Sequence, residues 1–304
     1  MKLSINTQRK FLDEIKQFSV FKECGFDGTD FSLSLYFDKN GKFADIDAVT
    51  DEFIKDYFTS LGNEAKNAGI EISQVHSQFS GHPRNYNNDV EDIIKREIAS
   101  IKAAYYLGSK LIVIHPIITP GRFYDFKLEE SFNESVAFYK RLLPTLEEYD
   151  MCCCVENMWV CDPVYQNICN TIFSHADEMV RMCEVLGDRF KICLDIGHGL
   201  LTQDDPVEMV KICKDKLACL HTHDNDGFMD LHTFPFSKFE TPYGLAWKPI
   251  RVNWPELMKA LKEIGYNGVL NFEIQVPAPS PEVQKAGLTY LSAIGRYLVS
   301  LYNN

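Results

Sequence analysis

Residues 190–195 read FKICLD, an apolar run that ends on a carboxylate. A strand buried on both faces of a parallel sheet reads as such a near-continuous apolar stretch. Four further runs have this form and end on a residue that can bind a metal: LIVIH at His115, CCCVE at Glu156, LACLH at His221 and VLNFE at Glu273. A weaker run, IEISQVH, ends at His76. Active sites of α/β barrels lie where parallel strands end, so the six endings predict one shared site.

Working outward from these runs, strands and helices alternate along the chain. We expect eight strands, at 2–6, 26–33, 69–76, 110–115, 151–156, 190–195, 216–221 and 268–273. We expect helices at 47–68, 88–107, 129–149, 174–186, 206–214, 254–265 and 281–301. Eight strands that are each followed by a helix or a long loop predict an α/β fold, the (β/α)8 TIM barrel. We expect one domain over residues 1–304.

One connection, at about 222–253, is unusually long and shows no helical period. Structureless loops of this length are usually functional or disordered. Its aromatic residues favour an ordered loop that covers the site and contacts the substrate. The aromatic candidates for such contacts, including one from an earlier loop, are Trp159, Phe234, Tyr243 and Trp247.

The composition excludes several classes of protein. The formal net charge is -12 and no basic block is present, which argues against nucleic-acid binding. No apolar run approaches the length of a membrane span, and the charged start lacks an apolar signal core, so we expect a cytoplasmic protein. The adjacent Cys152, Cys153 and Cys154 cannot share a bridge, and we expect the ten cysteines to be buried, reduced thiols.

Three carboxylates and one imidazole form the strongest candidate metal site: Glu156, Asp195, His221 and Glu273. Such an oxygen-rich set suits Mn²⁺, Mg²⁺ or Co²⁺ and accepts Zn²⁺. Two glutamates beside a metal can also act as an acid/base pair around an enediolate.

A second group of residues is expected to hold substrate or further metal: His76, His115, His198, Asp230 and His232. His198 follows Asp195 in LDIGHG, where it can face the pocket from the loop after that strand. Asp230 and His232 form a D-x-H pair in the long loop. The neighbouring HTHDND contains three ambiguous residues, of which Asp224 is expected to orient His221. The other two are His223 and Asp226.

The motifs FDGTDFSL, VHSQF, IVIHP, VENM, LDIGHGLL, LHTHDNDG, DLH and FEI resemble, in order and spacing, the xylose-isomerase-like barrel superfamily. Its members include sugar and sugar-phosphate isomerases and epimerases, inosose dehydratases and endonuclease IV. The resemblance implies that Glu156, Asp195, His221 and Glu273 are metal ligands and that the two glutamates exchange protons with substrate. It implies that His198 contacts a substrate oxygen. In endonuclease IV, positions matching the second group complete a three-zinc cluster.

Two departures separate this chain from relatives. The stretch TFPFSKFETPYGLAWKPIRVNW, at residues 233–254, is longer and more aromatic than the loop in many of them. The arginine that some epimerases place after the histidine of the seventh strand has no counterpart in HTHDNDG. The substrate therefore cannot be carried over from a relative.

The leading hypothesis is a metal-dependent isomerase or epimerase of a sugar or sugar phosphate, without a nicotinamide cofactor. A lyase or dehydratase of a keto-sugar or inosose would share the first half-reaction. A phosphodiesterase with a multinuclear zinc site fits the ligands, but the acidic charge opposes it. A barrel that only binds a ligand is the non-enzymatic alternative. Homo-oligomers are common among such barrels and are compatible with this sequence.

Overall fold

The computed structural model describes residues 1–304 except 14, 80–89, 119–126, 163, 238–251 and 304. Eight parallel strands form one sheet in the described part of the chain, in the order β10-β1-β2-β3-β4-β5-β8-β9. These strands are β1 (Leu3–Asn6), β2 (Gly28–Ser32), β3 (Glu71–His76), β4 (Leu111–Val113), β5 (Cys152–Glu156), β8 (Phe190–Asp195), β9 (Leu217–His221) and β10 (Leu270–Phe272). All eight strands expected from the sequence are present.

The sheet closes into a barrel just beyond the ends of its first and last strands. Thr222, which follows β9, forms a parallel bridge with Phe272 in β10. The backbone N–H of Thr222 donates to the carbonyl of Asn271 at 2.9 Å, and the N–H of Glu273 donates to the carbonyl of Thr222 at 3.2 Å. The (β/α)8 barrel expected from the sequence is therefore confirmed.

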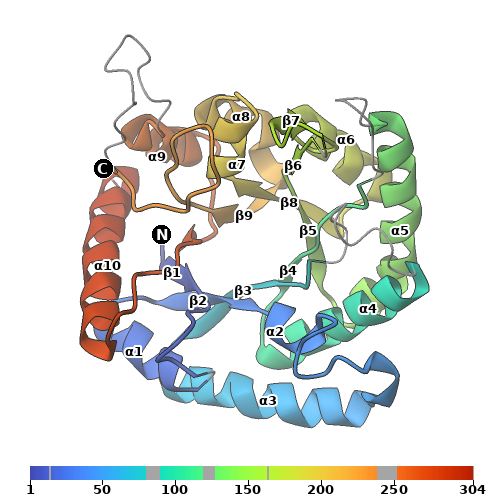
Figure 1. The fold of residues 1–304 in the computed structure, drawn as a ribbon, viewed down its shortest axis with the longest axis horizontal. Helices are drawn as coiled ribbons and strands as arrows, with labels where there is room; N and C mark the ends of the chain where they lie inside the picture. Colours follow the sequence, from blue (N-terminus) through green and yellow to red (C-terminus); the bar gives the residue numbers. More distant parts are fainter. Residues whose placement is uncertain (14, 80–89, 119–126, 163, 238–251, 304) are drawn as a thin grey trace.

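Helices surround the strands as an outer ring (Figure 1). The helices are α1 (Lys16–Cys24), α2 (Ser34–Phe37), α3 (Asp51–Asn67), α4 (Val90–Leu107), α5 (Leu128–Glu148), α6 (Ala176–Leu186), α7 (Ile196–Leu201), α8 (Pro206–Cys213), α9 (Trp254–Glu263) and α10 (Pro281–Asn303). The seven expected helices are confirmed as α3, α4, α5, α6, α8, α9 and α10. The helices α1, α2 and α7 were not expected, nor was the hairpin of β6 (Trp159–Cys161) and β7 (Ile168–Asn170).

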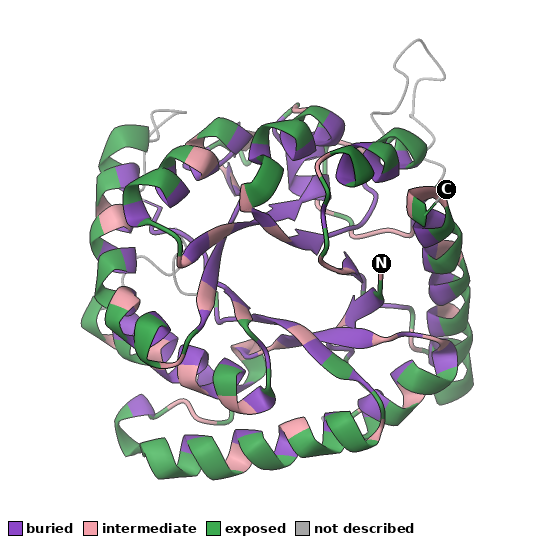
Figure 2. Ribbon diagram, turned by 180° about the vertical axis from the view of Figure 1, so that it is seen from behind, coloured by how far each residue is buried: buried purple, intermediate pink, exposed green. Residues whose placement is uncertain are grey.

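Burial follows the barrel architecture. The strands are buried along most of their length, and the helices bury one side and expose the other (Figure 2). None of the ten cysteines is in a disulfide, and all but the half-buried Cys152 and Cys161 are buried. No described helix has both the length and the apolar character needed to cross a membrane.

The described part of the long connection after β9, residues 222–237, contains neither helix nor strand. It is held by local hydrogen bonds, including an antiparallel bridge between Asp224 and Thr233. The carboxylate of Asp226 accepts from the backbone N–H groups of Phe228 and Met229, at 2.9 and 2.8 Å, and so forms a turn. Tyr243 and Trp247 lie outside the described residues.

Candidate metal centre and active site

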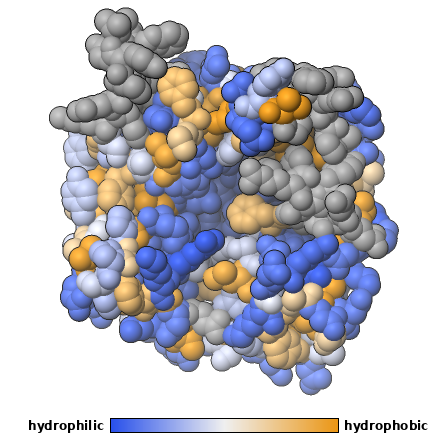
Figure 3. Space-filling model, in the orientation of Figure 1, coloured by the Kyte–Doolittle hydropathy of each residue, from blue (hydrophilic) through white to orange (hydrophobic). Residues whose placement is uncertain are grey.

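The four residues of the predicted metal site all come from the same end of the barrel. Glu156 is the last residue of β5, Asp195 of β8 and His221 of β9, and Glu273 directly follows β10. The register pairs Asp195 with His221, so these two side chains leave neighbouring strands at the same level. Hydrophilic side chains line a hollow near the centre of the face drawn in Figure 1 (Figure 3).

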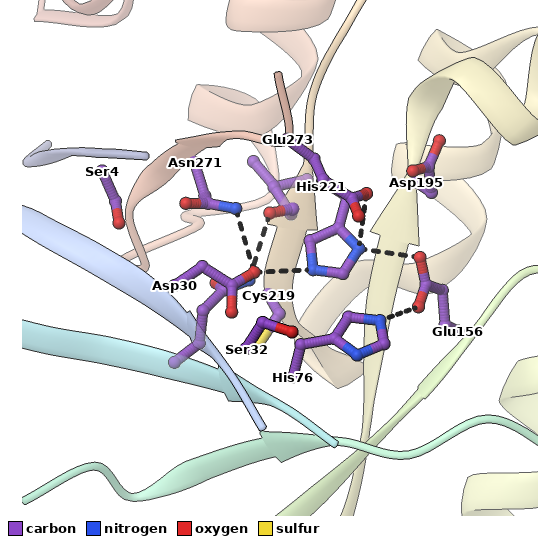
Figure 4. Close-up of polar contacts among 12 residues, drawn as sticks. Ser4, Asp30, Ser32, His76, Glu156, Asp195, Cys219, His221, Asn271 and Glu273 are labelled. Carbon is purple, nitrogen blue, oxygen red and sulfur yellow. Dashed lines mark hydrogen bonds and ion pairs between the residues drawn. The ribbon is translucent and has the colours of Figure 1, made fainter. Parts of the chain in front are cut away.

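His221 is the centre of a buried cluster of carboxylates (Figure 4). Its Nδ1 atom lies 2.7 Å from Oε1 of Glu156 and 3.4 Å from Oε2 of Glu273. Its Nε2 atom lies 2.9 Å from Oδ2 of Asp30. The ring therefore has one edge fixed by Asp30 and the other facing the two glutamates.

Glu156 also contacts the two histidines of the preceding strand ends. Its Oε2 atom accepts from Nε2 of His115 at 2.8 Å and lies 3.4 Å from Nε2 of His76. His76 ends β3, whereas His115 lies beyond the end of β4. The structure thus places both predicted pocket histidines against a predicted metal ligand.

Asp195 is oriented differently from the other three. Its Oδ1 atom accepts from the backbone N–H of His198 at 2.7 Å and lies 3.2 Å from Nε2 of His223. Its Oδ2 atom is buried without a hydrogen-bond partner. Asn157 fixes the Asp195 backbone by donating to its carbonyl and accepting from its N–H, both at 2.7 Å. This buried oxygen is therefore available to bind a cation.

The other residues of the second group, His198, Asp230 and His232, lie together beside Asp195 and are called the outer group below. Nε2 of His198 lies 3.6 Å from Oδ2 of Asp230, and Nε2 of His232 lies 3.1 Å from Oδ1 of Asp230. His198 was expected in a loop but lies in α7, where Asp195 caps the helix. His232 has a φ of 45°, in the left-handed region, which is uncommon outside glycine and often marks functional sites.

In the HTHDND segment, Asp224 and His223 make contacts that differ from those expected from the sequence. Asp224 does not orient His221, because its carboxylate lies 3.4 Å from the indole nitrogen of Trp254 and its backbone pairs with Thr233. His223, which was ambiguous, stacks on His232 with ring centroids 3.9 Å apart and an interplanar angle of 10°. This stacking brings His223 into the outer group.

Three buried residues of the site were not found from the sequence. Asp30, at the level of the His221 ring, is held by the amide groups of Gln74 at 3.0 Å and Asn271 at 3.2 Å. Asp30 lies in the FDGTDFSL motif, where its position near a strand end was the available signal. Nothing in the local sequence indicates that Gln74 and Asn271 converge on it.

The aromatic residues proposed to cover the substrate have different locations. Trp159, at the start of β6, has its ring centroid 6.3 Å from that of His198, edge to face. Phe234 packs on Tyr290 at 5.8 Å. Trp159 therefore borders the site, whereas Phe234 packs against α10.

The ionisation of the cluster follows from its mutual contacts. Burial acts to raise the pKa of Glu156, but the charge of His221 and the hydrogen bond from His115 outweigh it and hold the pKa well below its ordinary value. Burial acts to lower the pKa of His221, yet the charges of Glu156 and Glu273 raise it well above its ordinary value. Burial raises the pKa of Glu273. Glu273 is therefore the more easily protonated of the two glutamates.

The donor set fits divalent metal ions. Within several sets of three residues, the possible ligand atoms all lie within 4.8 Å of one another. The sets include His76–His221–Glu273, His76–His115–Glu156, His198–Asp230–His232 and His223–His232–Glu273. Two buried atoms without a hydrogen-bond partner support the same conclusion: Oδ2 of Asp195 and Nδ1 of His115. Buried polar groups are normally satisfied, so these atoms are candidates for binding a cation.

Sequence comparison agrees with this arrangement. The profile of the xylose isomerase-like TIM barrel family matches residues 18–294. The chain belongs to that family. An uncharacterised protein of Methanocaldococcus jannaschii is 27% identical over 258 residues, which cover 80% of this chain and 90% of that protein. Another from the same organism is 26% identical over 204 residues, which cover 66% of this chain and 63% of that protein.

Several solved structures have the same fold. A putative xylose isomerase from Rhodospirillum rubrum has a TM-score of 0.72 at 14% identity, covering 98% of this chain and 99% of that one. The structure of D-psicose 3-epimerase from Clostridium cellulolyticum with D-tagatose has a TM-score of 0.68 at 16% identity, covering 98% of this chain and 99% of that one. The structure of 3-keto-D-glucoside 4-epimerase from E. coli has a TM-score of 0.64 at 16% identity, covering 96% of this chain and 100% of that one. At these identities the likeness shows that this xylose isomerase-like barrel shares their fold.

Proposed function

We propose that this protein is a divalent-metal-dependent isomerase or epimerase that acts on a sugar or sugar derivative. The observation that carries the proposal is the position of Glu156 and Glu273, which both approach Nδ1 of His221 at the end of the barrel. Two carboxylates at one metal-binding edge can remove a proton from a carbon next to a carbonyl and return it elsewhere. The epimerases among proteins of the same fold support this reading.

The residues proposed to hold the metal are Glu156, Asp195, His221 and Glu273. A bound divalent ion would polarise the substrate carbonyl and stabilise the negative charge of an enediolate. The hard carboxylate oxygens suit Mn²⁺, Mg²⁺ or Co²⁺, and the histidine also suits Zn²⁺.

The two glutamates differ in access to the substrate. The side chain of Glu273 is 18% exposed and lines a pocket, whereas that of Glu156 is 1% exposed. Burial raises the pKa of Glu273, which brings it closer to neutral pH and makes it the better group for exchanging a proton. We therefore assign the first proton transfer to Glu273 and the complementary transfer to Glu156.

Solvent isotope exchange tests the proposal. Metal-loaded protein is incubated with ketoses and ketose phosphates in D₂O, and proton NMR follows deuterium entering beside the carbonyl. We expect metal-dependent incorporation that a chelator abolishes and that Glu156→Gln and Glu273→Gln reduce at least 100-fold, in the range of general acid–base contributions. Glu256→Gln, an exposed glutamate in α9, is the control. Full turnover after chelation, or in Glu156→Gln, would contradict the proposal.

The same spectra separate isomerisation from a lyase reaction. Both begin with loss of the same proton, and they differ only in the fate of the enediolate. Release of water or of a leaving group from the β-carbon would identify the protein as a lyase or dehydratase.

A second candidate, hydrolysis of a phosphate ester at a multinuclear site, is favoured by one observation. The triads His76–His115–Glu156 and His198–Asp230–His232 flank the proposed metal site and could each hold another ion. Metal analysis of the purified protein tests this candidate. Three zinc ions per chain with phosphodiesterase activity would support it, and one ion with isotope exchange would support the isomerase. The net charge of -12 makes a nucleic acid an unfavourable substrate.

A further inference from the structure

A pocket runs from the proposed metal site toward the loop that follows β1. Its inner wall includes His76, Asp30 and Glu273, which belong to the cluster around His221. Its outer wall carries hydroxyl, amide and guanidinium groups of Asn6, Thr7, Arg9, Ser32, Ser34 and Gln275. The two ends of the pocket therefore differ in chemistry, and no role has so far been assigned to the outer end.

Two glutamines fix the backbone that carries Arg9. The side-chain amide of Gln8 donates to the carbonyl of Ile274 at 2.7 Å and accepts from the N–H of Val276 at 3.0 Å. Gln275 reciprocates by donating to the carbonyl of Thr7 at 2.7 Å and accepting from the N–H of Arg9 at 3.2 Å. We call these four bonds the glutamine clasp. The clasp joins the chain after β1 to the chain after β10, beyond the point where the strands pair.

A further bond secures the other side of Arg9. The side-chain amide of Gln284, in α10, donates to the carbonyl of Arg9 at 2.9 Å. The backbone N–H and carbonyl of Arg9 are thus both bonded to side chains. In contrast, the guanidinium has no hydrogen bond or ion pair with any described residue, and Arg9 is exposed. A fixed backbone with an unpaired cation is suited to binding a ligand, because the loop is already ordered before the ligand arrives.

Arg9 is the only arginine or lysine among the described residues that line this pocket. It is unpaired in a chain whose formal net charge is -12, where acidic partners are abundant. Two hydroxyls stand on the same wall, and Oγ of Ser32 lies 2.8 Å from Oγ of Ser34. Only one hydroxyl hydrogen is used between them, so one remains to donate to a ligand.

We propose that Arg9, with Ser32 and Ser34, forms a subsite for an oxyanion group of the substrate, a phosphate or a carboxylate. This inference rests on the proposed function and specifies its substrate as an anionic sugar derivative. Arginine binds both oxyanions through paired N–H donors. Arg9, Ser32 and Ser34 line the same pocket as Glu273, so an anion held by these three residues leaves the rest of the substrate to extend toward Glu273.

Binding measurements on the metal-loaded protein test the subsite without requiring turnover. Calorimetric titrations compare inorganic phosphate, D-fructose 6-phosphate, D-fructose and D-glucuronate. We expect the phosphate ester to bind more tightly than D-fructose, and Arg9→Gln to weaken its binding roughly 10- to 100-fold, as expected for a hydrogen bond to a charged group. Binding of D-fructose should change less than about 2-fold, since the arginine does not contact its reacting end.

Lys10→Gln is the matched control, because it removes the neighbouring positive charge. Lys10 does not line the pocket, and its ammonium lies 3.5 Å from the carbonyl of Ala278. We expect Lys10→Gln to leave phosphate binding intact and Arg9→Lys to restore part of it. Equal affinity for the ester and the neutral sugar, or equal losses in Arg9→Gln and Lys10→Gln, would overturn the proposal.

The comparison of anions identifies the group that is recognised. Arg9-dependent binding of D-fructose 6-phosphate and inorganic phosphate assigns a phosphate, and Arg9-dependent binding of D-glucuronate alone assigns a carboxylate. Anion binding that depends on Arg9 but is never accompanied by isotope exchange would retain the subsite and reject the isomerase. Isotope exchange with neutral sugars that Arg9→Gln does not affect would retain the isomerase and reject the subsite.

Discussion

The Nε2 atom of His221 lies 2.9 Å from Oδ2 of Asp30, across the interior of the barrel from β9 to β2. Histidines that bind metals usually donate their other ring N–H to a carboxylate or carbonyl, which fixes the tautomer and the ring orientation. With Nε2 occupied by Asp30, Nδ1 is the nitrogen that faces Glu156 and Glu273. Asp30 therefore fixes the ring so that the Nδ1 edge of His221 faces the proposed metal site.

Replacing Asp30 with asparagine is expected to weaken metal binding without unfolding the protein. Loss of such an outer carboxylate typically lowers metal affinity 10- to 100-fold. The affinity for Mn²⁺ or Zn²⁺ is measured by competition with a chelator, and folding by circular dichroism. The control Asp27→Asn removes a carboxylate that instead pairs with Arg296 at 2.8 Å, and its metal affinity should be unchanged. Unchanged affinity in Asp30→Asn would show that Asp30 does not orient the ring.

Adding a methyl group at Gly197 is expected to disturb the outer group. A Cβ there would overlap the ring of His223, which lies between Asp195 and the stacked His232. Overpacking of this kind costs about 1–3 kcal/mol, and we expect Gly197→Ala to lower the free energy of unfolding in urea by that amount.

Gly199→Ala is the control for this change, because it adds the same methyl group to the same helix. Its Cβ would lie 2.8 Å from Sδ of Met209, the flexible part of a side chain that can move. A loss in Gly199→Ala as large as that in Gly197→Ala would attribute the effect to helix α7 as a whole.

Metal binding is expected to strengthen as pH rises from about 6.5 to 9. Burial opposes the charged form of His232, but Asp230 and Glu273 raise its pKa from 6.5 to about 9. Its charged form therefore stabilises the metal-free fold below pH 6.5, and this contribution is lost as the pH rises through about 9. A divalent ion on Glu273 and Asp195 would offset the negative charges that raise this pKa, so metal binding favours the neutral imidazole and releases the proton.

Calorimetry in two buffers with different ionisation enthalpies measures that release. We expect proton release at pH 7 that declines toward pH 9, and a larger metal-induced rise in Tm at pH 8.5 than at pH 6.5. His232→Gln should reduce the number of protons released. Metal affinity that is independent of pH over this range would contradict the prediction.

Replacing either glutamine of the clasp with alanine is expected to lower the stability of the fold, and the two losses should differ in size. Gln8 is buried, and Gln8→Ala leaves the carbonyl of Ile274 and the N–H of Val276 without their partner. Loss of such buried bonds costs about 1–3 kcal/mol. Gln275 is exposed, so water can replace it and Gln275→Ala should cost less. Urea unfolding measures the stability of both variants. Phosphate titration of the same variants shows whether the clasp also holds Arg9 in position to bind the anion.

Much of the fold could be predicted because its signals are local. Runs such as FKICLD and MCCCVE are apolar and continuous, and α3 and α9 have one buried and one exposed face. The short helix α7 was missed because GHG contains two glycines, which are poor helix formers. Its formation depends on Asp195, whose side chain caps it by accepting from the N–H of His198.

The site was predictable to the extent that its residues end strands. Glu156, Asp195 and His221 could be placed at one end of the barrel because parallel strands share a direction. Which side chains contact one another was harder to predict from the sequence. Asp224 was expected to orient His221, but Asp30 does so from 191 residues away in the chain. Sequence proximity favoured the wrong carboxylate.

The sequence by itself determined the alternation of strands and helices, the end of the barrel at which the candidate site residues gather and the types of side chain found there. These features follow from hydrophobic patterning and from the common direction of parallel strands, which are properties of short segments. Only the tertiary structure decided which atoms meet: the Asp30 contact of His221, the stacking of His223 on His232 and the clasp beneath Arg9. Closing the barrel brings residues near both ends of the chain together, and that long-range contact has no local signal.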